Sequence, residues 1–207
     1  MTSARRMSRE DKRRRIIDAA VDVFAEKGFF GAKVSEIAEA AGVADGTIYL
    51  YFKSKDDLLI SLFEEKMGEI VRRLQELLAD IHDPEAKMRA YIHGHLSLVA
   101  EQPNLMQVLT IELRQSARFI KEYSPKAFAK YLAVVGQILD EGRRSGVFRS
   151  DLDPGVFRRA LFGAVDEIAR EWVLKSREPD AKFDAGKTGE QIAEFIVRGL
   201  KADGPVE

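Results

Sequence analysis

The chain has 207 residues, of which 45% are hydrophobic and 32% are charged, and its formal net charge is -1. This is the composition of a globular protein with one sizeable core or two small ones. The absence of cysteine excludes disulfide bridges and thiolate metal sites. No apolar run approaches the roughly 20 residues that cross a bilayer, and the first ten residues lack the apolar stretch of a secretory signal. The composition therefore predicts a cytoplasmic protein with no membrane span.

Positive charge is concentrated at the start of the chain. Residues 1–55 hold eleven Lys and Arg against eight Asp and Glu, whereas the remainder carries an excess of four negative charges. Within residues 1–15 the basic side chains are Arg5, Arg6, Arg9, Lys12, Arg13, Arg14 and Arg15. Such an arm suits the neighbourhood of nucleic-acid phosphates, and a solvated disordered tail is the alternative interpretation.

Apolar residues recur at helical spacing along almost the whole chain, without the alternation typical of strands, so the predicted fold class is all-α. Ser8 can cap the first helix, and Gly28 can close it in the left-handed conformation. A second short helix is expected over residues 34–41, where Gly42 stops it. The link GVAD leads into a third helix that begins near Asp45. Two short helices joined by so tight a turn predict a helix-turn-helix.

The third helix has two different faces. At 100° per residue, Ile48 and Phe52 share one face and point into a small core. The other side presents Gly46, Thr47 and Leu50, with Tyr49 and Tyr51 at the flanks. A DNA major groove accepts one helix of this width. The alternative, that the aromatic rings only seal the core, holds for Phe52 but does not account for Leu50 and Tyr51 together.

Each exposed group has a chemistry that suits DNA. Gly46 lets the backbone approach closely, and Leu50 can touch a thymine methyl group. Thr47, Tyr49 and Lys55 can bond to phosphates.

These residues carry a family resemblance, because IAEAAGVADGTIYLYFKSKDDLL resembles the DNA-binding signature of the TetR family of bacterial transcriptional repressors. The resemblance extends over residues 10–63. It implies an N-terminal three-helix DNA-binding domain with a basic arm over residues 1–55 and a helical ligand-binding and dimerisation domain over residues 56–207. It also implies that a homodimer binds a palindromic operator in double-stranded DNA.

The resemblance assigns roles residue by residue. It implies base or groove contacts for Ala44, Asp45, Gly46, Leu50 and Tyr51, and backbone contacts for Thr47, Tyr49 and Lys55. Many family members have Thr where this chain has Lys33. The hydroxyl cap of the second helix is therefore missing, and Lys33 is expected to contact a phosphate directly.

The rest of the chain is expected to be helical. A long amphipathic helix runs from Asp56 to the break DIHDPE and is placed to couple a ligand to the DNA-reading unit. Further helices are expected over residues 84–101, 104–116, 125–142, 154–175 and 188–200.

The last two helices carry more apolar surface than a small domain needs, so they are predicted to form a dimer face, with an internal core as the alternative. The residues concerned are Phe157, Leu161, Phe162, Val165, Ile168, Trp172, Ile192, Phe195, Ile196 and Leu200.

The sequence gives little support for catalysis or metal binding. His93 and His95 are two residues apart, so a helix points them about 200° apart and they cannot hold one metal ion. Asp166, Glu167 and Glu112 lack an accompanying nucleophile motif, phosphate loop or zinc signature. The protein is therefore expected to be no enzyme and to need no metal or cofactor. An adaptor or structural protein is the other class that remains.

The segments VADGTIYLYFKSKDDLLISLFEEKMG, IELRQS and FGAVDEIAREWV resemble the acyl-CoA-responsive fatty-acid-degradation repressors of the family. The expected effector is a long-chain acyl-CoA that releases the repressor from DNA. Its acyl chain would need an apolar lining, for which the candidates are Phe63, Met67, Leu96, Met106, Leu109, Phe128, Leu132, Phe162 and Trp172.

Arg114, with Arg118 or Lys121, is expected to meet the phosphates of coenzyme A. For every apolar candidate, ordinary core packing is the alternative interpretation, and it is favoured for any single one of them. A drug, a flavonoid or a free fatty acid is the alternative effector.

Overall fold

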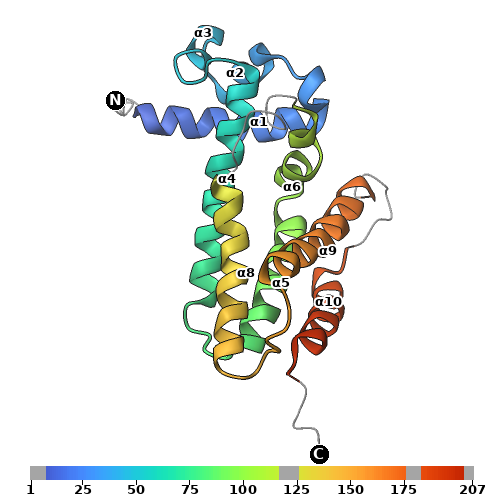
Figure 1. Cartoon of the computed structure of the whole chain (residues 1–207). Coiled ribbons are helices and arrows are strands. Elements are labelled where there is room, and N and C mark those ends of the chain that lie inside the picture. Colours follow the sequence, from blue (N-terminus) through green and yellow to red (C-terminus); the bar gives the residue numbers. More distant parts are fainter. Residues whose placement is uncertain (1–7, 117–125, 176–182, 203–207) are drawn as a thin grey trace, which may run out of the picture. The chain divides into compact units, whose positions relative to one another are not determined.

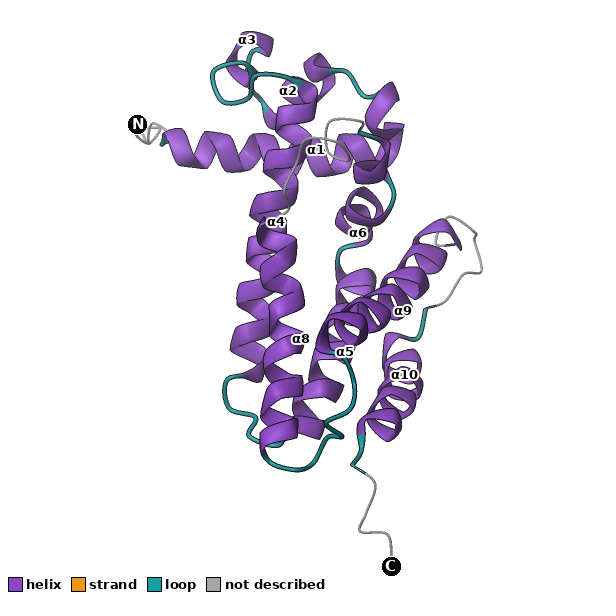
Figure 2. Cartoon of the chain, viewed as in Figure 1, coloured by secondary structure: helices purple, strands orange, loops and turns teal. Residues whose placement is uncertain are grey.

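A computed structural model describes residues 8–116, 126–175 and 183–202 (Figure 1). All regular elements in these ranges are helices (Figure 2), which confirms the predicted all-α class. They are α1 (Arg9–Gly31), α2 (Val34–Ala41), α3 (Asp45–Ile48), α4 (Lys55–Leu78), α5 (Pro84–Glu101), α6 (Pro103–Thr110), the 3₁₀ helix η1 (Glu112–Gln115), α8 (Lys126–Arg144), α9 (Pro154–Lys175) and α10 (Ala185–Leu200).

The helices pack as two units. The first comprises α1 to α3, the start of α4 as far as Phe63, and a later segment that begins at Gln107 and includes η1. The second comprises the chain from Glu64 to Met106 together with α8, α9 and α10. The first unit, as the packing defines it, therefore continues beyond residue 55, where the sequence predicted the domain boundary. Helices α4 and α6 each contribute residues to both units.

The ends of α1 follow from local chemistry. The Ser8 hydroxyl accepts from the Asp11 amide at 3.0 Å, and the Asp11 carboxylate accepts from the Ser8 amide at 3.2 Å. This capping box confirms the predicted role of Ser8. Gly28 has the predicted positive φ of 74°, but its ψ of 161° lies outside the left-handed helical region. It therefore breaks α1 without ending it, and one further turn continues to Gly31.

The first unit has a core of its own. Its largest fully buried side chains lie in α1 to α4 and just after α3, and are Ile16, Ile17, Phe24, Ile37, Ile48, Phe52, Leu58, Leu59 and Leu62. Each such side chain contributes about 1.5–3 kcal/mol relative to an exposed position. The predicted core positions Ile48 and Phe52 are confirmed.

The core of the second unit is built around α5, which packs against α8, α9 and α10 (Figure 1). Gly189 of α10 allows the close approach to α5, because a Cβ atom there would stand 2.5 Å from Nδ1 of His93. Leu161, Val165 and Leu200 are buried inside this core. Their assignment to a dimer face is therefore wrong, and the internal-core alternative holds for them.

One predicted helix is divided. A single helix was expected over residues 104–116, but α6 ends at Thr110 and Glu112 to Gln115 form η1. Ile111, between them, has φ -115° and ψ -63°. The break turns the Glu112 side chain into the first unit, where it finds a hydrogen-bond donor. The last helix also begins earlier than expected, at Ala185, because Asp184 caps it through the Lys187 amide.

Candidate DNA-contact surface and ligand-binding region

The turn between α2 and α3 is set by Gly42, which adopts φ 64° and ψ 40°. This left-handed residue ends α2 as predicted, and the Val43 amide bonds back to the Ala38 carbonyl at 2.9 Å. Helix α3 then occupies only Asp45–Ile48, which is shorter than the periodicity predicts. Tyr49 still has helical dihedral angles. The backbone amides of Tyr51 and Phe52 both donate hydrogen bonds to the Ile48 carbonyl, which closes the turn.

Residues 44–51, called here the reading segment, expose large side chains. Leu50 is 71% exposed and Tyr49 is 59% exposed. A Cβ atom at Gly46 would meet nothing within 4 Å, so the backbone is open to a close approach. Ala44 and Asp45 are exposed, and Thr47 and Tyr51 are half-buried. Two large exposed side chains on so small a unit indicate a surface that binds a partner.

The basic start of α1 lies against this segment. The Arg9 guanidinium lies 5.8 Å from the ring centroid of Tyr51, and that of Arg13 lies 5.4 Å from the ring centroid of Phe52. These cation–π contacts bring positive charge to the reading segment. Arg5 and Arg6 of the predicted arm lie outside the described residues.

Lys33 and Lys55 have different surroundings. Lys33 is exposed at the start of α2, and the Glu36 carboxylate accepts from its backbone amide at 2.9 Å. The Lys55 ammonium instead donates to the carbonyls of Ala32 at 2.9 Å and Phe30 at 3.3 Å. Lys55 therefore ties the α1–α2 turn to α4, and its predicted phosphate contact remains a prediction.

Aromatic side chains gather inside the second unit. The rings of Phe128 and Phe162 meet edge to face with centroids 4.8 Å apart, and both lie near Tyr131. Trp172 stacks on Phe183 at 4.9 Å. Among the other predicted lining residues of this unit, Met67, Leu96 and Met106 are buried and Leu132 is half-buried.

A buried polar cluster adjoins these rings, and sequence reasoning missed it because it tested the histidines only as metal ligands. His95 Nδ1 lies 2.5 Å from the Tyr131 hydroxyl. Burial lowers the pKa of His95 to about 4, so the ring is neutral at pH 7, and burial raises the pKa of Tyr91 and of Tyr131. His95 Nε2 and the Tyr91 hydroxyl have no hydrogen-bond partner among the described residues.

The predicted ligand residues do not all fall in one unit. Phe63, Leu109 and Arg114 belong to the first unit, and the other seven belong to the second. Arg114 is exposed on η1. Its predicted partners Arg118 and Lys121 lie outside the described residues.

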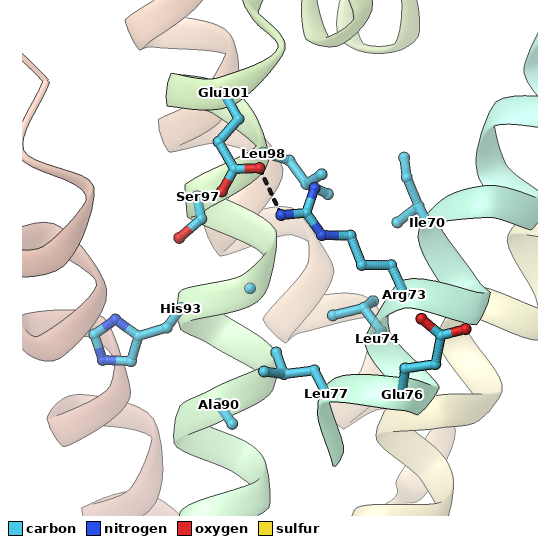
Figure 3. A pocket seen from close by; sticks show the side chains of 11 residues that line it. Ile70, Arg73, Leu74, Glu76, Leu77, Ala90, His93, Ser97, Leu98 and Glu101 are labelled. Atoms are coloured by element: carbon cyan, nitrogen blue, oxygen red, sulfur yellow. Dashed lines mark hydrogen bonds and ion pairs between the residues drawn. The ribbon is translucent and has the colours of Figure 1, made fainter. Parts of the chain in front are cut away.

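A cleft of about 500 Å³ lies between α4 and α5 in the second unit (Figure 3). Its floor is apolar, and Arg73 reaches across it to Glu101 at 2.6 Å. The lining residues are Ile70, Arg73, Leu74, Glu76, Leu77, Ala90, His93, Gly94, Ser97, Leu98 and Glu101. None of the predicted ligand residues is among them.

The part of the chain that the structure describes contains no group of three or more potential metal-ligating side chains. No helix there is long and apolar enough to span a bilayer.

Comparison with known proteins decides the family. A profile of bacterial regulatory proteins of the tetR family matches residues 16–62, and a profile of the C-terminal region of YsiA-like proteins matches residues 63–199. The chain belongs to the TetR family of bacterial regulators. The resemblance seen in the sequence is thereby confirmed, and the family is one of transcriptional regulators.

Individual relatives cover nearly the whole chain. The fatty acid metabolism regulator protein of Bacillus subtilis is 42% identical over 185 residues, which are 89% of this chain and 93% of the relative. The crystal structure of the transcriptional regulator FadR from Bacillus subtilis in complex with stearoyl-CoA has a TM-score of 0.82 and 40% identity over 90% of this chain and 98% of that one. The fatty acid degradation regulator FadR from Bacillus halodurans has a TM-score of 0.80 and 40% identity over 91% of this chain and 99% of that one.

Proposed function

We propose that the protein is a homodimeric repressor of fatty-acid degradation genes, which binds a palindromic operator and is released by a long-chain acyl-CoA. The observation that carries the proposal is the 42% identity, over 89% of the chain, to a fatty acid metabolism regulator. The similarity to a FadR structure that contains stearoyl-CoA supports the same class of effector. A cytoplasmic location, where operator and acyl-CoA are both present, belongs to this proposal.

Operator binding rests on the exposure of the reading segment. Leu50 and Gly46 are open to base edges, and the Tyr49 hydroxyl and Lys33 can reach phosphates. A dimer explains how so short a segment gains affinity, because two copies engage two half-sites.

Replacing Tyr49 with phenylalanine removes only the hydroxyl and is expected to weaken binding to operator and to unrelated DNA by a similar factor, because phosphate contacts carry no sequence information. Replacing Leu50 with alanine is expected to weaken operator binding alone, by roughly 5- to 150-fold, because base contacts specify the site. Fluorescence anisotropy on both DNAs measures the two effects. Unchanged operator affinity in both variants would refute the assignment.

The ligand proposal rests on the second unit, whose interior combines buried aliphatic side chains with the Phe128 and Phe162 rings. Such an interior suits a long alkyl chain. For the ligand to release DNA, it must favour the conformation that does not bind the operator, and a shift from 99:1 to 1:99 takes about 5.5 kcal/mol. A long buried chain can supply a difference of this size.

Acyl-CoAs of increasing length are expected to release the operator complex with increasing potency. Each buried methylene contributes about 0.8 kcal/mol, so two further carbons tighten binding roughly tenfold until the pocket ends. Free coenzyme A is expected to be inert. Titration of operator complexes by anisotropy measures the release. Release by free fatty acids but not by thioesters would favour the alternative effector class, and the absence of any length dependence would exclude the fatty-acid proposal.

A further inference from the structure

Residues 107–116, called here the bracing segment, lie in sequence between the two parts of the second unit but belong to the first unit. Glu112 lies at the centre of the segment and is only 4% exposed. Its Oε2 atom accepts hydrogen bonds from the Phe29 amide at 2.7 Å and from the Gln115 side-chain amide at 3.1 Å. A buried carboxylate is costly unless such donors satisfy it, so its position is specific.

The Glu112 carboxylate lies at the break in α1. Gly28 has φ 74°, and a Cβ atom there would stand 3.4 Å from Oε2 of Glu112. The break frees the Phe29 amide from the helical ladder and points it at the carboxylate. Glu112 thus supplies the acceptor that the interrupted helix lacks.

Two further contacts brace the same region. The Gln107 side-chain amide donates to the Ala25 carbonyl of α1 at 2.6 Å. The Ser116 hydroxyl donates to the Asp56 carboxylate, in the first turn of α4, at 2.7 Å. The bracing segment is therefore bonded to the end of α1 at two points and to the start of α4 at a third.

Phe29 links this bracing to the turn between α1 and α2. It is buried, and its ring lies 5.7 Å from that of Phe24 and 4.9 Å from the Lys55 ammonium. Lys55 in turn holds the Phe30 and Ala32 carbonyls, immediately before α2. The hydrogen bond to Glu112 thus anchors the turn from which α2 and the reading segment start.

We infer that Glu112 is a positioning residue that holds the α1–α2 turn in its DNA-binding arrangement and that effector control operates by releasing it. The second part of this inference rests on the proposed function. Helix α6 begins in the second unit, and only Ile111 separates its end from Glu112. A displacement of α6 by a ligand therefore reaches the carboxylate through one residue of chain.

Three variants test the inference. Glu112→Ala removes the acceptor, and operator affinity without ligand is expected to fall by roughly 10- to 100-fold. Glu112→Gln keeps an oxygen in place and is expected to restore most of that affinity. Gln115→Ala, which removes the other donor, is the matched control and is expected to change operator affinity less than threefold. Anisotropy with operator DNA measures all three.

The size of the ligand effect on operator binding distinguishes a positioning role of Glu112 from a general loss of stability. In Glu112→Ala, stearoyl-CoA is expected to bind with unchanged affinity but to weaken operator binding by a smaller factor than in the parent protein, because part of the release has already occurred. Equal operator affinity and an equal ligand effect in Glu112→Ala and the parent would overturn the inference. If no acyl-CoA binds the parent, the proposed effector fails, while the ligand-free affinities still decide the role of Glu112.

Hydrogen exchange provides a readout that needs no variant. Stearoyl-CoA is expected to speed amide exchange in a peptide spanning Phe29 at least threefold, while exchange within α2 stays unchanged. If Glu112→Ala fails to fold, this measurement decides on its own, because unchanged exchange at Phe29 in protein saturated with stearoyl-CoA would refute release.

Discussion

Replacing Gly142 with alanine is expected to destabilise the protein by about 3 kcal/mol, because the helix α8 has no room for a methyl group at this position. A Cβ atom there would stand 1.9 Å from Cδ2 and 2.5 Å from Cγ of Phe148. The ring is buried, and the Phe148 amide bonds to the Gly142 carbonyl at 3.0 Å, so it cannot move away easily. Thermal unfolding should show a loss of roughly 6–12 °C in Tm for a chain of this size.

Gly68→Ala is the matched control. Gly68 lies in α4, and a Cβ atom there would meet nothing within 4 Å. Alanine has the higher helix propensity, so this variant is expected to gain up to about 1 kcal/mol. Equal melting temperatures for the two variants would show that the contact between Gly142 and Phe148 does not limit the packing of α8.

Replacing Phe195 with glutamate is expected to dissociate the proposed dimer and to lower operator affinity by roughly 10²- to 10⁴-fold, because a monomer engages a single half-site and loses the avidity of the pair. Phe195 of α10 is 78% exposed, and α9 exposes Val156 and Leu174 at 68% and 54%. An unpaired carboxylate at the exposed position of Phe195 opposes burial against a second copy. Sedimentation gives the oligomeric state, and anisotropy gives the affinity.

Leu77→Glu is the control for this change. Leu77 is also an exposed apolar residue, but it lies on the α4–α5 cleft rather than on α9 or α10. The variant is expected to remain dimeric and to bind the operator normally. A dimeric Phe195→Glu protein with full affinity would place the dimer face elsewhere.

Local patterns in the sequence were sufficient for most of the helices. Ser8 and Gly42 act as predicted because capping and left-handed geometry depend on neighbouring residues alone. The periodicity failed where a distant partner competed with it. The pattern of residues 104–116 predicted one helix, but the helix ends at Thr110. Glu112 instead accepts a hydrogen bond from a donor 83 positions earlier in the sequence.

The sequence predicted the DNA-contact surface more fully than the ligand-binding region. The two faces of the reading segment followed from helical geometry, since Ile48 and Phe52 had to point into the small core. The ligand region did not follow, because a buried Leu or Phe has the same pattern whether it lines a pocket or fills a core. Leu161 and Val165 show this limit, as both belong to the interior of the second unit.

By itself, the sequence determined the all-α class, the helix-turn-helix and the TetR family, because these depend on short-range periodicity, caps and a contiguous motif. Only the tertiary structure decided the partners of Lys55, His95 and Glu112. A polar side chain can bond to any group that packing brings within about 3 Å, and their partners Ala32, Tyr131 and Phe29 lie 23, 36 and 83 positions away along the chain. Such pairings arise only when the helices pack.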